Sequence, residues 1–263
     1  MPVPTTRHLL LAPYSGALPA PICFRSAAMP AAGIYPSHSH SWGEFVYALS
    51  GVVEVLVAGK HYLVPPQYGI WLPPRVAHTG QNRHPACHSS LYVSEALCGE
   101  LPAAPCALVV TPFVRAMHEH LRSHPPGMPQ TIHEERLLYV LLDQLARATP
   151  VGSYLPSSDD PMLGKVLAML DNTPGDDRPL AVLAQAVNTT ERTLMRRCQR
   201  DLGMSFAQWR ARLRVIKAMT MLEAGQTVES IAFDLAYASS SAFITMFRKV
   251  TGETPDEYRR RSA

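Results

Sequence analysis

The chain has 263 residues, of which 47% are hydrophobic and 17% charged, and its formal net charge at pH 7 is +3. This composition is sufficient for one large or two ordinary folded domains and excludes an intrinsically disordered chain. No stretch approaches the roughly 20 apolar residues that span a bilayer, and the apolar patch at 9–12 is too short for a signal peptide. We therefore expect a cytoplasmic protein without a membrane partner.

Residues 1–110 are predicted to form a barrel or sandwich of short strands. Runs rich in β-branched and aromatic residues alternate with Gly-containing turns at Ser50-Gly51 and 58–60. The proline pairs at 65–66 and 73–74 suggest edge strands and barrel rims rather than central strands. The expected strands are Glu44–Leu49, Val52–Val57, Tyr68–Leu72 and Ser89–Val93.

Histidines and one glutamate form the most informative pattern in this region. His38 and His40 are two residues apart, so on a strand both would point to the same face, and Glu44 keeps the same parity. His78 follows a short segment with two prolines. Three imidazoles and one carboxylate suit a divalent transition metal such as Fe, Mn, Ni or Zn, with room for a water or a ligand. The alternative is that the histidines line an effector pocket without metal.

These four residues lie in segments that resemble the cupin metal motif, and the resemblance places His38, His40, Glu44 and His78 at its ligand positions. Gly33, the first glycine of the motif, is one residue closer to His38 than is usual in cupins. Arg75 replaces a glycine that is common in the second part of the motif. The resemblance allows an enzymatic function, a metal-dependent cupin dioxygenase or isomerase fused to the part of the chain that follows. His61, Tyr47 or Tyr62 would then have to supply the acid or base. We expect a protein that is not an enzyme.

Two helices are predicted in 111–150, at Pro112–Ser123 and Thr131–Thr149. The second carries a wide apolar stripe, which either packs on the barrel or forms a homodimer. Residues 151–160 are rich in Gly, Ser, Pro and Asp and are predicted to be a linker. The leucines of the stripe are Leu137, Leu138, Leu141, Leu142 and Leu145.

Residues 161–263 contain a weak internal repeat with an offset of 49 residues, in which Leu194 matches Phe243 and Gly203 matches Gly252. Each copy has helix-turn-helix character, at about 180–201 and 228–250. Asn188 suits the first turn, and Thr189 or Thr190 can cap the helix that follows. In the second copy, Thr227 and Ser239 are the expected caps, and Gly252 ends the helix.

The second helix of each copy is predicted to enter the major groove of DNA. Arginines can bond guanine edges, small hydroxyls can bond several bases, and an aliphatic side chain can contact a thymine methyl group. The connecting segment Phe206–Glu223 would span about 27 Å as a helix, close to the ~34 Å between major grooves on one side of a duplex. The expected DNA-binding residues are Arg192, Met195, Arg196, Arg200, Ser240, Ser241, Ile244, Thr245, Arg248 and Lys249.

The predicted barrel part and the predicted helix-turn-helix part of the chain also differ in charge. Residues 1–160 contain 9 Lys and Arg against 10 Asp and Glu, whereas residues 161–263 contain 15 against 11. All 11 histidines lie in the first part. A basic second part is expected if it contacts phosphate. The 5 cysteines form no CxxC pair, which is typical of free thiols in a reducing compartment.

The segments "TERTLMRRCQRDLGMSFAQWR" and "SIAFDLAYASSSAFITMFRKVTGETPDEYR" resemble the DNA-binding domain of the AraC/XylS family of bacterial regulators. The resemblance covers about 100 residues, from ~160 to ~260, and departs from the family pattern at Ala236 and Cys198. It implies a sequence-specific transcription regulator of promoter DNA, with RNA polymerase as a partner. It also implies that the barrel is a sensing domain for a small molecule or a metal. An adaptor that contacts RNA polymerase and touches DNA only loosely is a third interpretation.

The expected fold is therefore α+β with more than one domain. A cupin-like barrel (1–110) with two helices (111–150) is joined by a linker (151–160) to an all-helical domain (161–263). In that domain a long helix connects the two helix-turn-helix units.

Overall fold

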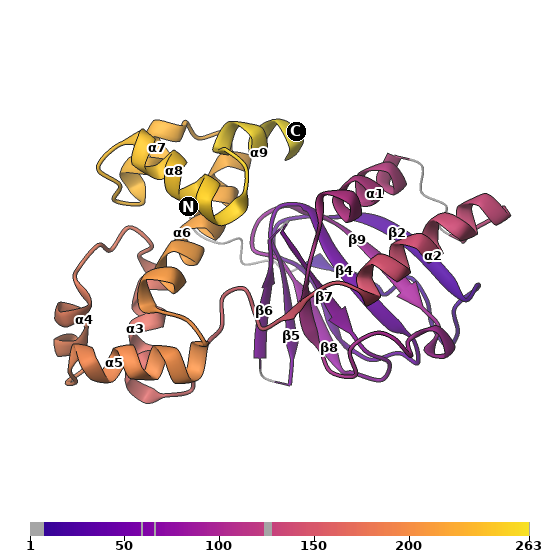
Figure 1. Cartoon of the computed structure of the whole chain (residues 1–263), viewed down its shortest axis with the longest axis horizontal. Helices are drawn as coiled ribbons and strands as arrows, with labels where there is room; N and C mark the ends of the chain where they lie inside the picture. Colours follow the sequence, from indigo (N-terminus) through magenta and orange to yellow (C-terminus); the bar gives the residue numbers. More distant parts are fainter. Residues whose placement is uncertain (1–7, 59, 66, 124–127, 263) are drawn as a thin grey trace. The chain divides into compact units, whose positions relative to one another are not determined.

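A computed structural model describes residues 8–58, 60–65, 67–123 and 128–262 (Figure 1). The chain folds as two compact units, Met1–Tyr154 and Leu155–Ala263. The boundary between them falls inside the segment 151–160. Across the described ranges, none of the helices combines the length and the apolar character that crossing a bilayer requires.

The first unit is built on two β-sheets. The five-stranded sheet has the order β1-β3-β8-β5-β6, and the six-stranded sheet has the order β11-β10-β7-β4-β9-β2. Neighbouring strands are antiparallel, except that β1 runs parallel to β3. Within the described residues no ladder joins the two sheets, so the expected barrel is a pair of sheets rather than a closed cylinder.

The strands of the five-stranded sheet are β1 (His8–Leu9), β3 (Gly33–His38), β8 (His78–Gln81), β5 (Val53–Val57) and β6 (Lys60–Val64). Those of the six-stranded sheet are β11 (Pro150–Val151), β10 (Cys106–Val109), β7 (Tyr68–Leu72), β4 (Gly43–Ser50), β9 (Ala86–Val93) and β2 (Ile22–Met29). A short 3-10 turn, Glu95–Leu97, follows β9.

The prolines on either side of β7 do not place it at an edge, contrary to the expectation. β7 pairs with β10 on one side and β4 on the other, so it is an interior strand. Pro65 and Pro73 lie beyond its two ends, where the missing amide donor does not interrupt a ladder. The prolines therefore mark the ends of this strand.

The two faces of the six-stranded sheet bury different cores. One face packs through Phe45 and Trp71 against α1 (Pro112–Ser123) and α2 (Ile132–Ala146), which lie along that side of the sheet (Figure 1). The other face contributes Val46 and Leu72 to a second core, shared with the five-stranded sheet. Leu138, Leu141, Leu142 and Leu145 of α2 are buried in the first core. The leucine stripe thus packs on the sheet, and a homodimer would need another surface.

The second unit is helical. Its elements are α3 (Pro161–Asn172), α4 (Leu180–Ala186), α5 (Glu191–Arg197), the π-turn Cys198–Leu202, α6 (Phe206–Glu223), α7 (Val228–Asp234), α8 (Ser240–Thr251) and α9 (Pro255–Ser262). The long connecting helix has the expected bounds, and Figure 1 shows it running between α3–α5 and α7–α9. The second helix of each helix-turn-helix unit, here called its reading helix, is α5 in the first and α8 in the second. α5 is shorter than expected because the backbone changes to π-helical geometry at Cys198.

The predicted helix caps are confirmed. Thr190 Oγ1 accepts a hydrogen bond from the Thr193 amide (3.2 Å), and Ser239 Oγ accepts one from the Ala242 amide (3.1 Å). Gly203 and Gly252 have φ angles of 67° and 84°, the left-handed conformation that ends a helix. The local sequence therefore fixes where both reading helices begin and where their segments end.

The two turns differ in length by one residue. The left-handed residues of the turns, Asn188 (φ 53°) and Ala236 (φ 56°), are 48 positions apart, whereas the caps Thr190 and Ser239 are 49 apart. A left-handed alanine costs roughly 1–2 kcal/mol because its Cβ crowds the backbone. The departure at Ala236 therefore leaves the turn geometry in place and adds strain.

Candidate metal centre and nucleic-acid interface

Three histidines of the first unit converge on one point. His38 ends β3, His78 begins β8, and His40 lies in the connection between β3 and β4. One ring nitrogen from each lies within 4.8 Å of the other two. His38 and His78 are directly opposite on the β3–β8 ladder, so the ladder itself sets the distance between their rings.

Glu44 lies beside the three histidines, as predicted, but it belongs to a different strand from the one expected. Its Oε2 atom lies 3.2 Å from His40 Nε2 and 3.6 Å from His78 Nε2. The chain leaves β3 after His38, and Glu44 belongs to β4 of the other sheet. Alternation along one strand is therefore the wrong explanation. The four residues meet because the two sheets pack face to face.

Backbone carbonyls hold all three imidazoles in one tautomer. His38 Nδ1 lies 2.7 Å from Pro36 O, His40 Nδ1 lies 2.7 Å from Trp42 O, and His78 Nδ1 lies 2.9 Å from Val76 O. A carbonyl oxygen can only accept, so Nδ1 is assigned the proton and Nε2 keeps its lone pair when the ring is neutral. This is the support that histidine ligands of metals receive in proteins.

Glu44 and the histidines shift one another's protonation. Burial raises the pKa of Glu44, but hydrogen bonds and charge from His40 and His78 lower it by more, so its pKa lies well below the usual range. Burial lowers the pKa of His78, yet Glu44 raises it by more, and the net pKa of His78 is raised. Burial lowers the pKa of His38. The site therefore presents a carboxylate that prefers a cation as its partner.

A small cavity adjoins this cluster. Its volume is ≈ 40 Å³, which is room for roughly three water molecules. Trp42 forms one wall and stacks on His40, with ring centroids 4.7 Å apart and planes 3° apart. Sequence reasoning did not single out the cavity's other aromatic and apolar residues, because they come from strands of both sheets. They include Tyr35, Val46, Val55, Leu72 and Tyr92.

In the second unit, α5 with the turn that follows it, and α8, each have one buried face and one exposed face. Leu194, Cys198, Phe243 and Phe247 are fully buried. Within the described part of the chain, neither Arg192 nor Arg196 forms an ion pair. The exposed residues of the predicted set are Arg192, Met195, Arg196, Arg200, Ser241, Thr245, Arg248 and Lys249, while Ser240 and Ile244 are half-buried.

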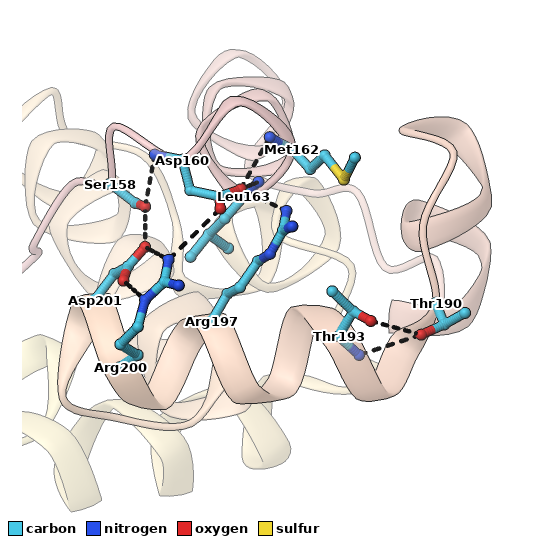
Figure 2. Close-up of polar contacts among 9 residues, drawn as sticks. All are labelled: Ser158, Asp160, Met162, Leu163, Thr190, Thr193, Arg197, Arg200 and Asp201. Atoms are coloured by element: carbon cyan, nitrogen blue, oxygen red, sulfur yellow. Dashed lines mark hydrogen bonds and ion pairs between the residues drawn. The ribbon is translucent and has the colours of Figure 1, made fainter.

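Arg200 differs from Arg192 and Arg196, because its guanidinium forms ion pairs with carboxylates (Figure 2). It pairs with the neighbouring Asp201 and lies 3.5 Å from Asp160 Oδ2. Arg197 Nη1 lies 2.7 Å from Asp160 Oδ1, and Ser158 donates to Asp201 Oδ2 at 2.6 Å. The structure therefore favours a supporting role for Arg200, which ties the end of the first reading helix to the segment before α3.

Asp160 is the residue of this network that sequence reasoning missed. Its carboxylate accepts hydrogen bonds from the amides of Met162 and Leu163, both at 3.0 Å, and so caps α3. Asp followed directly by Pro161 is a helix-start signal that the sequence already contains. The partnership with Arg197 carries no such signal, because the two residues are 37 positions apart.

Comparison with known proteins assigns a domain family to each of the two units. Residues 21–142 match the family of AraC-like ligand-binding domains, and residues 183–261 match a family of helix-turn-helix domains. The chain is 33% identical over 223 residues to the HTH-type transcriptional regulator NimR of Escherichia coli K12, covering 85% of this chain and 81% of NimR. It is 29% identical over 123 residues to the HTH-type transcriptional activator RhaS of Escherichia fergusonii, covering 46% of this chain and 44% of RhaS.

Two solved structures are also similar. ToxT of Vibrio cholerae aligns with a TM-score of 0.40 and 12% identity, over 92% of this chain and 98% of ToxT. The DNA-binding domain of AdpA, solved with a target DNA, aligns with a TM-score of 0.36 and 27% identity, over 37% of this chain and 89% of that one. The sequence matches to NimR and to the two domain families decide the assignment: the chain belongs to the AraC family of transcription regulators, with an AraC-like ligand-binding domain followed by a helix-turn-helix DNA-binding domain.

Proposed function

We propose that this regulator reads promoter DNA with the exposed faces of α5 and α8, and that the metal centre of its first unit is its sensor. The observation that carries the DNA interface is a fully buried inner face on each reading helix, together with Arg192 and Arg196 on the outer face of α5, which form no ion pair with any residue that the structure describes. The inner face of α5 is fixed in the core, so the long side chains of Arg192 and Arg196 on its outer face are available to bind DNA.

The residues of the predicted interface, both the exposed ones and the half-buried Ser240 and Ile244, have chemistry that suits particular contacts with DNA. Arg192 and Arg196 reach guanine edges, with Met195 between them on the same face. Ser240, Ser241 and Thr245 bond base edges, and Ile244 contacts a thymine methyl group. Arg248 and Lys249, near the end of α8, contact phosphates. Arg200 supports α5 through Asp160 and Asp201.

Replacing Arg196 by alanine is expected to weaken DNA binding by about 1–3 kcal/mol and to relax the base preference at one position. The probe is the duplex that the wild-type protein footprints upstream of its own gene, and affinity is measured by fluorescence anisotropy over a series of salt concentrations. Lys165→Ala is the matched control, because it removes one exposed cation from α3, outside the interface. An Arg196→Ala protein with a wild-type footprint would refute the assignment of α5.

The metal proposal is supported by the donor set itself. Three imidazoles with Nδ1 bonded to carbonyls and one buried carboxylate are suited to Fe, Mn, Ni or Zn. His38, His40, His78 and Glu44 would hold the ion, which would supply a Lewis-acidic position to a small effector. The adjoining cavity, with its apolar and aromatic wall, would then receive only a small apolar group of that molecule.

A His38→Ala/His40→Ala double variant is expected to lose essentially all of the divalent metal that the wild-type protein retains after gel filtration, because two of three imidazole donors disappear. The measurement is elemental analysis by mass spectrometry, together with the rise in melting temperature on adding Zn²⁺ or Ni²⁺. His120→Ala/His133→Ala is the control, since both of these histidines are exposed and lie outside the cluster. Equal metal content in the two double variants would end the metal proposal.

RNA polymerase is the protein partner that we propose for this regulator. RhaS is described as a transcriptional activator, and activation at a promoter acts on the polymerase. A homodimer would have to form through a surface other than the leucine stripe of α2, which is buried within the unit.

A further inference from the structure

Arg214 lies where the two helix-turn-helix units meet. It belongs to α6, the helix that connects them, and only 8% of its surface is exposed. A buried guanidinium is costly unless its N–H groups are hydrogen-bonded and its charge is compensated. The partners of Arg214 therefore identify the segments of the chain that this buried guanidinium connects.

The first set of partners belongs to the first helix-turn-helix unit. Arg214 Nε donates to Pro174 O at 3.2 Å, and Arg214 Nη2 donates to Asp176 O at 3.3 Å. One turn earlier on α6, Arg210 donates to Arg178 O at 2.8 Å. These carbonyls all lie in the loop between α3 and α4, so α6 holds the segment from which the first helix-turn-helix unit begins.

The other partner belongs to the second helix-turn-helix unit. The Arg214 guanidinium lies over the ring of Tyr237, 5.2 Å from its centroid. Tyr237 is in the turn between α7 and α8, and its own amide donates to Ala232 O at 2.8 Å. Its ring also packs against Phe243 of α8, with centroids 5.6 Å apart. The second reading helix is thereby connected to Arg214 through one aromatic ring.

A close backbone contact joins the same two segments. A Cβ atom at Gly175 would lie 2.2 Å from Asp234 O, a distance that no side chain tolerates. The loop before α4 and the end of α7 thus approach each other directly, beside Arg214. The two helix-turn-helix units are in contact laterally as well as through α6.

We propose that Arg214 is a positioning residue that fixes the distance and rotation between the two reading helices, and so determines which half-site spacing the regulator accepts. This rests on the proposed DNA interface. One extra base pair shifts a half-site by about 3.4 Å along the duplex and rotates it by roughly a tenth of a turn. Two recognition helices held rigidly tolerate such a change poorly, whereas two helices joined only end to end through α6 can adjust.

The test measures spacing preference with the full-length protein. Wild-type protein first selects its site from a library of randomised duplexes, and duplexes with one base pair inserted or removed between the two half-sites are then compared with it. We expect the wild type to bind the altered duplexes at least ~10-fold more weakly. For Arg214→Met we expect roughly 10-fold weaker binding to the selected duplex and a difference between spacings of only about 2–3-fold.

Lys217→Met is the matched control. Lys217 is also a cation on α6, but its ion pair is with Asp171 of α3 (2.8 Å) and involves no part of the second helix-turn-helix unit, so the spacing preference should remain that of the wild type. Gly175→Ala is the second test variant and should also loosen the spacing preference, because it forces apart the two segments that Arg214 joins while leaving the Arg214 side chain and the proposed DNA-reading side chains in the sequence. It also carries the test if Arg214→Met does not fold.

Three outcomes are distinguishable. Loosened spacing preference in Arg214→Met or Gly175→Ala, with Lys217→Met unchanged, supports the proposal. Uniformly weaker binding at every spacing, with the wild-type preference retained, overturns it, because Arg214 would then act on stability alone. A wild-type protein that enriches no sequence would instead remove the DNA interface on which the proposal rests.

Discussion

Replacing Phe247 by alanine is expected to lower the free energy of unfolding of the second unit by about 3–5 kcal/mol. Phe247 is fully buried on the inner face of α8. Its ring lies between Phe243 and Tyr258, with centroid distances of 5.7 Å and 6.0 Å. Alanine would lose both ring contacts and leave a cavity that the surrounding helices fill only in part. Since a domain has only ~5–15 kcal/mol of stability, DNA binding should fall with folding.

Hydrogen exchange followed by mass spectrometry is the suitable measurement, because it reports the two units separately. Protection of amides in α6 to α8 should fall by roughly two to four orders of magnitude, whereas amides of the sheets should keep theirs. Cys198→Ala at the equivalent position of the first repeat removes only a sulfur atom and should cost far less. Thr245→Ala on the exposed face of α8 should stay within about 0.5 kcal/mol of wild type. A Phe247→Ala protein that behaves like Thr245→Ala would contradict the core assignment.

The second unit was predictable from sequence because its signals are local. A cap such as Ser239 and a helix-ending glycine such as Gly252 act within one helical turn. The repeat then identified Phe243 and Phe247 as equivalents of Leu194 and Cys198, and all four side chains are fully buried. The hydrogen bonds at the helix ends and the burial of the repeated apolar residues favour the same helices, so the sequence pattern and the structure agree.

The sheets were harder to predict, for a physical reason. β2 contains Ser26, Ala27 and Ala28, and its pairing partner β9 lies more than 50 residues away, so no local pattern of alternation marks it. The proposed metal ligands were predicted from their chemistry, but alternation along one strand was the wrong explanation for their proximity. Glu44 reaches the histidines across two packed sheets. Contacts between distant segments, including Asp160 with Arg197, depend on tertiary packing that residue spacing does not encode.

His118 is expected to make the first unit less stable in mild acid. It lies on α1, is fully buried, and bonds the Ser89 hydroxyl through Nδ1 at 2.8 Å. Burial lowers the pKa of His118 from its ordinary value of 6.5 to about 3 in the folded state. Below pH ~6.5 the unfolded chain therefore binds a proton that the folded chain refuses. Stability falls as pH decreases from that point and stops falling, for this group, near the folded pKa.

The expected loss of stability follows from the lowered pKa of His118. Each pH unit between the two pKa values contributes about 1.36 kcal/mol, so going from pH 7.5 to pH 5.0 should cost about 2 kcal/mol at His118. The comparison is with His118→Asn, which keeps a hydrogen-bonding nitrogen near Ser89 but cannot titrate. The variant should be less stable than wild type at pH 7.5, yet lose about 2 kcal/mol less on acidification, as measured by urea unfolding of the full chain at each pH.

The difference between the two proteins isolates His118, because every other titrating group is shared. His88 is also buried, with its pKa lowered by burial to about 4, and it adds a parallel loss in both backgrounds. The rings around His118 belong to Phe24, Phe45 and Tyr47, and burial accounts for the lowered pKa of His118 among the described residues. Parallel pH profiles for wild type and His118→Asn would show that His118 is protonated in the fold, and that the core between α1 and the sheet admits water.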